Sequence, residues 1–142
     1  MTHVATVRTL LELRLVVPGR PHLPVRTHLR YAADDPWAVR VAFQTGAGID
    51  GGVEWTFARQ LLSEGLAGPC GDGDVRVWPA LKGHDRVVHL AMTSPSGSAL
   101  FEIDRDDVVE FLQQTCEAVP MGTEEDVVDL DAEIASLLRD RV

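Results

Sequence analysis

The sequence predicts an α+β domain of about seven antiparallel strands in a curved sheet or two-sheet layer, with one short inserted helix and two C-terminal helices. Three observations lead to this fold class. Apolar residues recur with a period of two along residues 1–103, Pro and Gly separate these runs, and the period changes to 3.6 along residues 104–142. The 142 residues match the size of one domain, 1–142. The sequence shows no β-α-β alternation, so we do not expect a doubly wound parallel sheet.

The strands are bounded by residues that cannot continue a ladder. Runs of alternating apolar residues predict strands at residues 11–17, 25–33, 37–44, 53–57, 74–79, 86–93 and 98–103. Three Pro and one Gly within 18–24 end the first strand, and Asp-Asp-Pro at 34–36 ends the second. In the third strand Trp37 is in phase with Val39 and Val41, so we expect Trp37 to pack in the core.

The remaining strands pair as hairpins on either side of a short helix. The Gly-rich loop 46–52 joins the third and fourth strands. Good helix formers at 58–65 predict the inserted helix, which ends at Gly65. Pro79 indicates an edge or a strand end for the fifth strand, because proline donates no ladder hydrogen bond. The S-P-S-G turn at 94–97 joins the last two strands.

Two helices are predicted after residue 103. Asp104 is a suitable N-cap, and the acidic residues at 106 and 107 favour the helix dipole. The apolar stripe of this helix comprises Val108, Phe111, Leu112, Thr115 and Cys116. The helix ends before Pro120, and an amphipathic pattern over residues 130–138 predicts the second helix.

Charge is distributed unevenly along the chain. Residues 1–101 carry 10 basic and 9 acidic side chains, whereas residues 102–142 carry 3 basic and 13 acidic ones. Such an acidic segment repels phosphate and disfavours generic nucleic-acid binding. The sequence has no run of 18 apolar residues and no signal-type N-terminus, so we expect a cytoplasmic protein without a membrane span.

No catalytic, cofactor or metal site is predicted. The G-x-G-x-x-G string at 46–51 precedes a predicted strand, whereas a dinucleotide site needs a helix there. None of the five His residues has zinc-ligand spacing, and no G-x-S-x-G motif is present. Capping explains the acidic residues at 104–107 without catalysis.

Five residues are candidates for a partner or subunit interface. Trp55 and Trp78 lie among apolar neighbours whose faces the pattern leaves ambiguous, and an exposed Trp favours a protein interface. Glu124, Glu125 and Asp126 would attract a basic partner, although a charge run can equally be a solvated face. The alternative function is single-stranded nucleic-acid binding, for which a continuous basic stripe across the sheet is the discriminating feature.

Six motifs in order resemble one known family over nearly the whole chain. They are DPWAV with FQTG at 35–46, VEWTFARQLLSEGL at 53–66, GDVRVWP at 73–79, SPSGSAL at 94–100, VPMGTE at 119–124 and DLDAE at 129–133. Together they resemble the SsgA-like sporulation and cell-division proteins of actinobacteria.

This resemblance implies a fold similar to the Whirly single-strand-binding proteins and a homotrimer. It also implies a non-enzymatic regulator that helps localise the FtsZ division machinery at sporulation septa, together with SsgA-type proteins. Other members act in septal peptidoglycan maintenance, spore separation and spore-wall maturation, and these roles remain alternatives. The sequence leaves open which member this is and which surface binds its partners.

Overall fold

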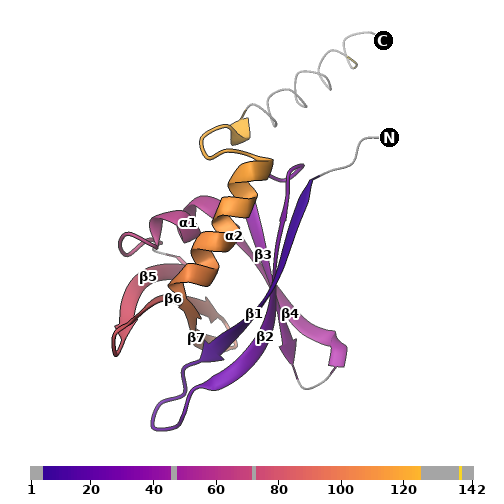
Figure 1. The fold of residues 1–142 in the computed structure, drawn as a ribbon. Helices are drawn as coiled ribbons and strands as arrows, with labels where there is room; N and C mark the ends of the chain where they lie inside the picture. The colour runs from indigo at the N-terminus through magenta and orange to yellow at the C-terminus, as the bar shows by residue number, and fades with distance from the viewer. Residues whose placement is uncertain (1–4, 46–47, 72, 126–137, 139–142) are drawn as a thin grey trace.

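The computed structural model describes residues 5–45, 48–71, 73–125 and 138. It confirms the predicted α+β class: one seven-stranded antiparallel sheet is accompanied by two helices (Figure 1). The elements are β1 (Thr6–Leu15), β2 (Leu23–Ala32), β3 (Ala38–Thr45), β4 (Gly48–Ala58), α1 (Arg59–Glu64), β5 (Val75–Lys82), β6 (Asp85–Ser94), β7 (Gly97–Asp104) and α2 (Arg105–Ala118). The strand order is β4-β3-β2-β1-β7-β6-β5, and the sheet is not closed.

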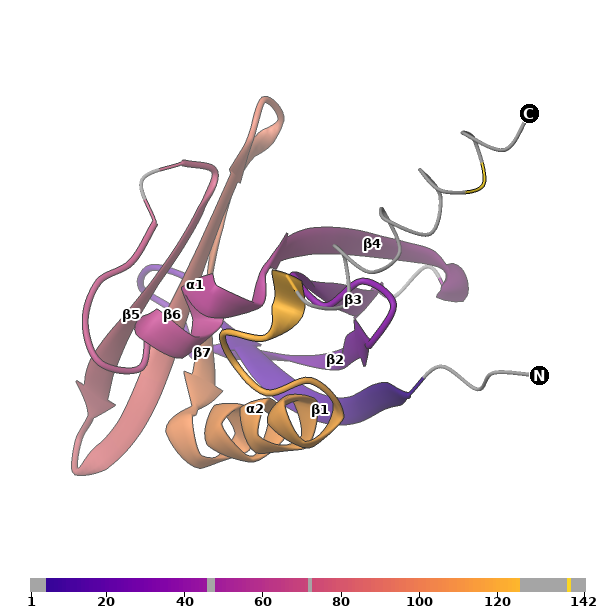
Figure 2. The same cartoon turned by 90° about the horizontal axis from the view of Figure 1, so that it is seen from above.

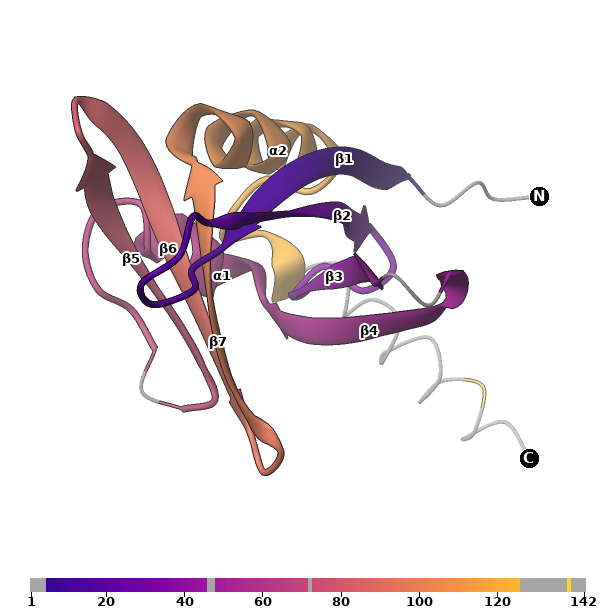
Figure 3. The ribbon, with the colours of Figure 1, turned by 90° about the horizontal axis from the view of Figure 1, so that it is seen from below.

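The sheet curls strongly at the junction of β1 and β7. The rings of Phe43 in β3 and Phe101 in β7 stack with their centroids 4.5 Å apart. These strands are three spacings apart in the sheet order, which is about 14 Å in a flat sheet. Figures 2 and 3 show the two halves, β4-β3-β2-β1 and β7-β6-β5, turned toward one another.

Strand alternation gives the sheet an inner face, which carries the core, and an outer face, which carries most of the charge. The inner face includes the buried residues Leu13, Leu29, Tyr31, Val39, Val41, Val77, Leu90 and Ile103. Helix α2 runs beside β1 and adds Val108, Phe111 and Leu112 to this core (Figure 2). The apolar stripe predicted for this helix is therefore confirmed in these three residues and in Thr115, which is also buried.

The edges and turns follow their sequence signals. Pro79 lies in β5, the last strand in the order of the described sheet, whose other side makes just an isolated bridge between Val77 and Cys70. The turn between β6 and β7 ends at Gly97, whose φ of 146° suits a residue without a Cβ. The G-x-G-x-x-G string overlaps β4, which begins at Gly48, five residues earlier than predicted. The string is therefore part of the β3–β4 hairpin and does not open a helix, although the predicted 46–52 loop was too long.

Three local predictions need correction or lie outside the described residues. Trp37 precedes β3 and is 42% exposed, so the expectation that it packs in the core was wrong. Asp104 occupies the N-cap position of α2, but its side chain makes no capping hydrogen bond and accepts one from Arg14 at 2.7 Å. The helix predicted at 130–138 lies outside the described residues except for Leu138.

None of the helices within the described part of the chain is long and apolar enough to cross a membrane.

Candidate protein-interaction surfaces

Arg59 is a buried cation that joins α1 to the end of α2. It follows directly after β4 as the first residue of α1, and it is only 1% exposed. Its Nη1 donates to the carbonyl oxygens of Thr115 at 3.2 Å and Val119 at 2.6 Å, and its Nη2 donates to the Glu124 carboxylate. The guanidinium also lies 4.8 Å from the centre of the Tyr31 ring, a cation–π geometry.

The Glu124 carboxylate is consequently held inside the protein. Burial acts to raise the pKa of Glu124, but the hydrogen bond and charge of Arg59, together with hydrogen bonds from backbone N–H groups, outweigh it and hold the pKa below its ordinary value. Glu124 is only 5% exposed, so its charge is directed at Arg59 and not at solvent. Of the acidic trio predicted for an interface, Glu125 is exposed and Asp126 lies outside the described residues.

Trp55 lines an apolar groove between the two halves of the curled sheet. The groove has a volume of about 400 Å³. Its apolar lining comes from Leu15, Val25, Phe43, Trp55, Met92, Ala99 and Phe101. Serines of the β6–β7 turn form its polar rim. A half-buried Trp in an apolar recess with a polar rim is the composition of a protein interface.

Trp78 lies on the outer face, at the end of a row that crosses four strands. The strand register aligns Arg14 with Glu102, Glu102 with His89, and His89 with Trp78. His89 meets the Trp78 ring edge-on, with the centroids 5.5 Å apart. The structure therefore separates the two predicted Trp residues onto opposite faces of the sheet.

Glu102, in the middle of this row, is buried beneath basic side chains. Its Oε1 accepts from Arg14 Nε at 2.9 Å and lies 3.3 Å from Lys82 Nζ, while His22 and His89 approach its Oε2 at 3.5 and 3.8 Å. Burial acts to raise the pKa of Glu102, but Arg14 and Lys82 outweigh it and lower the pKa below its ordinary value. Because Asp104 also pairs with Arg14, the Arg and Lys charges of this cluster are balanced by carboxylates.

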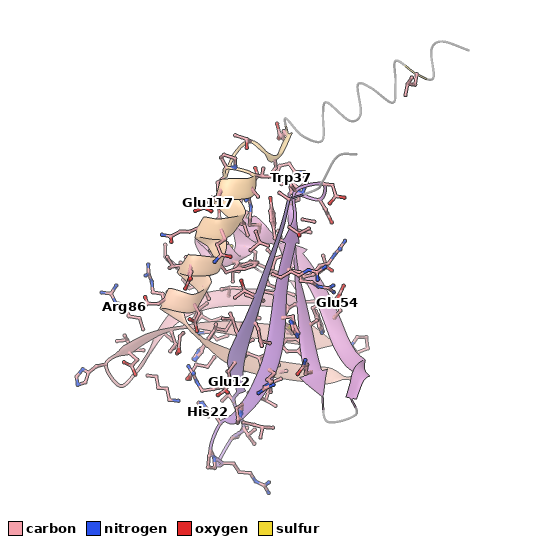
Figure 4. All side chains as sticks on the ribbon, turned by 45° about the vertical axis from the view of Figure 1, so that its right-hand side comes forward. Glu12, His22, Trp37, Glu54, Arg86 and Glu117 are labelled. Carbon is pink, nitrogen blue, oxygen red and sulfur yellow. The ribbon has the colours of Figure 1, made fainter. Side chains whose placement is uncertain are left out.

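A second row of the outer face consists of three arginines. The register places Arg8 opposite Arg30 and Arg30 opposite Arg40, across β1, β2 and β3. We call these three residues the arginine row. Glu54 pairs with Arg30, and Figure 4 shows Glu54 on the opposite side of the strands from α2. The basic row spans three strands, and Glu102 interrupts the positive charge farther along the sheet, so no continuous basic stripe crosses the described sheet.

The sequence pattern could not reveal these groupings. Arg59 resembles any helix-starting residue, and nothing local indicates that its partner is 65 positions away. The histidines at 22 and 89 looked isolated because their common neighbour, Glu102, is found only through the strand register. Alternation already places the members of both outer rows on one face of their strands. Knowledge of the strand pairing would have been enough to identify the two rows. Within the described residues, no group of His, Cys, Asp or Glu is arranged to hold a metal ion.

Comparison with known proteins agrees with this fold. The family model described as "Streptomyces sporulation and cell division protein, SsgA" matches residues 25–124. The chain belongs to the SsgA family. That match runs from the third residue of β2 through α2 and extends to Glu124.

Curated relatives of this SsgA-family protein cover nearly its whole length. The sporulation-specific cell division protein SsgB of Frankia casuarinae is 56% identical, covering 90% of this chain and 88% of that protein. SsgB of Streptomyces coelicolor is 49% identical, covering 94% of this chain and 96% of that protein. These relatives support a role in cell division during sporulation.

Solved structures confirm the architecture. A structure from work on SsgB mutations and longitudinal cell division during sporulation of Streptomyces coelicolor superposes with a TM-score of 0.84 at 48% identity. The superposition covers 89% of this chain and 99% of the Streptomyces coelicolor chain. The SsgA-like sporulation-specific cell division protein from Thermobifida fusca gives 0.85 at 42% identity, covering 96% of this chain and 98% of that one. The expected likeness to Whirly proteins stays a prediction.

Proposed function

We propose that this SsgA-family protein is a non-enzymatic adaptor that helps localise the FtsZ division machinery at sporulation septa. The observation that carries the proposal is its near-full-length similarity to proteins named sporulation-specific cell division protein SsgB. In this role it acts in the cytoplasm at the division septum, with FtsZ and SsgA-type proteins as partners. Its work is binding, so its surfaces and not a reaction centre determine its function.

The Trp55 groove is proposed as a subunit contact of a homotrimer. Its apolar lining favours association, since burying it removes apolar area from water, and the serine rim provides hydrogen bonds at the periphery. Closed symmetric assemblies are the usual form of soluble homo-oligomers. Trp78 and the exposed Glu125 then remain outside this groove, on surfaces available to partners.

Light scattering on the purified chain tests the assembly. We expect a mass three times that of the 15.5 kDa chain at micromolar concentration. Ser96→Arg places a charged side chain at the groove rim without altering the core, and should shift the protein toward monomer. Leu81→Ser, which replaces an exposed apolar residue away from the groove, should leave the mass unchanged. A monomeric wild-type protein would remove the trimer from the proposal.

Co-sedimentation with purified FtsZ filaments tests the adaptor role. Wild-type protein should pellet with filaments and remain in the supernatant without them. A labelled single-stranded oligonucleotide, tested in parallel at moderate salt, should not bind. Salt-sensitive oligonucleotide binding without filament binding would favour the nucleic-acid alternative, for which the arginine row is the best structural support.

A further inference from the structure

The arginine row places like charges side by side. Arg8, Arg30 and Arg40 occupy directly opposite positions on neighbouring strands of the outer face. Like charges directly opposite one another destabilise a sheet. Such a row is therefore costly to the free protein unless anions compensate it.

The protein compensates only part of this charge. Glu54 pairs with Arg30, and Asp35 approaches Arg40 at 3.4 Å, a loose and exposed ion pair. Among the residues that the structure describes, no carboxylate pairs with Arg8, and the buried Nε of Arg30 has no hydrogen-bond acceptor. Three cations with two carboxylates leave one positive charge without a counterpart among the described residues. The Glu102 cluster, by contrast, is balanced.

A hollow adjoins the row. The small residues Thr6, Ala32 and Ala38, each two positions from an arginine of the row on the same strand face, line it. Its lining includes the three arginines and Asp35, and its volume is about 100 Å³. A hollow of this size admits a small group such as a carboxylate.

We propose that the arginine row binds a side-chain carboxylate of an acidic segment in a partner protein. The proposal rests on the proposed adaptor role and specifies the chemistry of the partner surface. One uncompensated charge matches one carboxylate, and guanidinium groups bind carboxylates through paired, charge-assisted hydrogen bonds.

Nucleic acid fits this surface less well. Single-strand binding sites combine a basic groove with aromatic side chains on which bases stack. The described outward-facing residues of β1, β2 and β3 include no Phe, Tyr or Trp. The carboxylates of Glu54 and Asp35 at the flanks would also repel a phosphate backbone.

Fluorescence anisotropy with a labelled synthetic peptide of alternating Glu and Thr tests the proposal on the full chain. We expect binding at low salt that weakens as salt is added, and no binding of the matching Gln-Thr peptide. Arg8→Gln should weaken binding about three- to fivefold, as for a partly exposed ion pair. The matched control is Arg76→Gln, which removes an exposed cation from the outer face of the edge strand β5.

A measurement of thermal stability distinguishes a binding role of the arginine row from a purely structural role. Arg8→Gln relieves repulsion, so it should leave the thermal midpoint of the free protein unchanged or raise it. The Glu-Thr peptide should raise the midpoint of the wild type more than that of Arg8→Gln, because only a ligand of the native state stabilises it.

The proposal is overturned if the Glu-Thr peptide does not bind at low salt, or if Arg8→Gln and Arg76→Gln bind it as well as the wild type. Tighter binding of a single-stranded oligonucleotide with the same dependence on Arg8 would also overturn it. These outcomes are independent of the FtsZ assay. Loss of FtsZ binding alone would remove the adaptor proposal, whereas failure of the peptide alone would remove only this inference.

Discussion

At the residue scale, Arg59 and Glu124 determine how the segment after α2 is attached. A buried cation is costly without partners, and Arg59 has a carboxylate, two carbonyl oxygens and the Tyr31 ring, while its Nε has no acceptor among the described residues. The pair thus fixes the turn that carries Glu124 against α1. The chain continues from this fixed point toward its acidic C-terminal residues.

Removing one member of this pair should be strongly destabilising. We expect Glu124→Gln to lower the free energy of unfolding, and Arg59→Met to lower it by about 3–5 kcal/mol, because Arg59→Met leaves a carboxylate buried without its cation. Urea titrations at pH 7 measure both. The double variant should lose clearly less than the sum of the single losses. Additive losses would mean that the two side chains do not act as a pair.

Acid should weaken the protein through Glu102. Its folded-state pKa is lowered, so its contribution to stability is present above the ordinary value of 4.5 and is lost as the pH falls through the folded value. We expect Glu102→Gln to reduce stability at pH 7 and to flatten the loss of stability below pH 4.5. Urea midpoints measured from pH 7 down to the acid-unfolding range check this. Glu12→Gln, which replaces an exposed carboxylate of β1 that forms no ion pair with the Glu102 cluster, should retain the wild-type profile.

At the element scale, the close approach of α1 to β5 depends on Gly65. A Cβ at position 65 would lie 2.2 Å from Val77 Cγ1, and Val77 is fully buried in the edge strand. The sequence predicted Gly65 as the end of the helix. It could not predict this contact, because Val77 becomes a neighbour only when β5 folds beneath the helix.

Gly65→Ala should therefore destabilise the protein by about 1–3 kcal/mol through overpacking. Gly68→Ala is the matched control: it lies in the same loop, and a Cβ there would meet nothing within 4 Å. Thermal unfolding of both variants distinguishes the cases. Equal midpoints for Gly65→Ala and Gly68→Ala would show that the helix shifts away from β5 at little cost.

At the scale of the whole molecule, the sequence predicted the strands and turns well and their grouping poorly. Period-two alternation and turn residues are local signals. The sequence alone therefore predicted the strands, α1 and α2, and Pro79 indicated an edge or a strand end for β5. The strand order β1-β7 and the curl of the sheet are non-local, and they bring Arg14 to Glu102 and Phe43 to Phe101. Trp37 shows the limit of alternation. It is in phase with the buried Val39 and Val41, but β3 begins one residue later, at Ala38, and Trp37 is exposed.

The Phe43–Phe101 stack joins the two halves of the sheet, so the halves should unfold together. Because β1 and β7 pair over a short stretch, side-chain packing across the curl has to couple them. We expect one unfolding transition that coincides by tryptophan fluorescence and far-ultraviolet circular dichroism.

A double-mutant cycle of Phe43→Leu and Phe101→Leu should give a coupling of about 0.5–1.5 kcal/mol, the value typical of stacked aromatic pairs. Phe57, which is buried but forms no ring pair with Phe101 among the described residues, supplies the control cycle and should be nearly additive. Two separate transitions in the wild type would mean that the two halves unfold independently. Equal couplings in both cycles would mean that the backbone pairing of β1 and β7, and not this stack, holds the halves together.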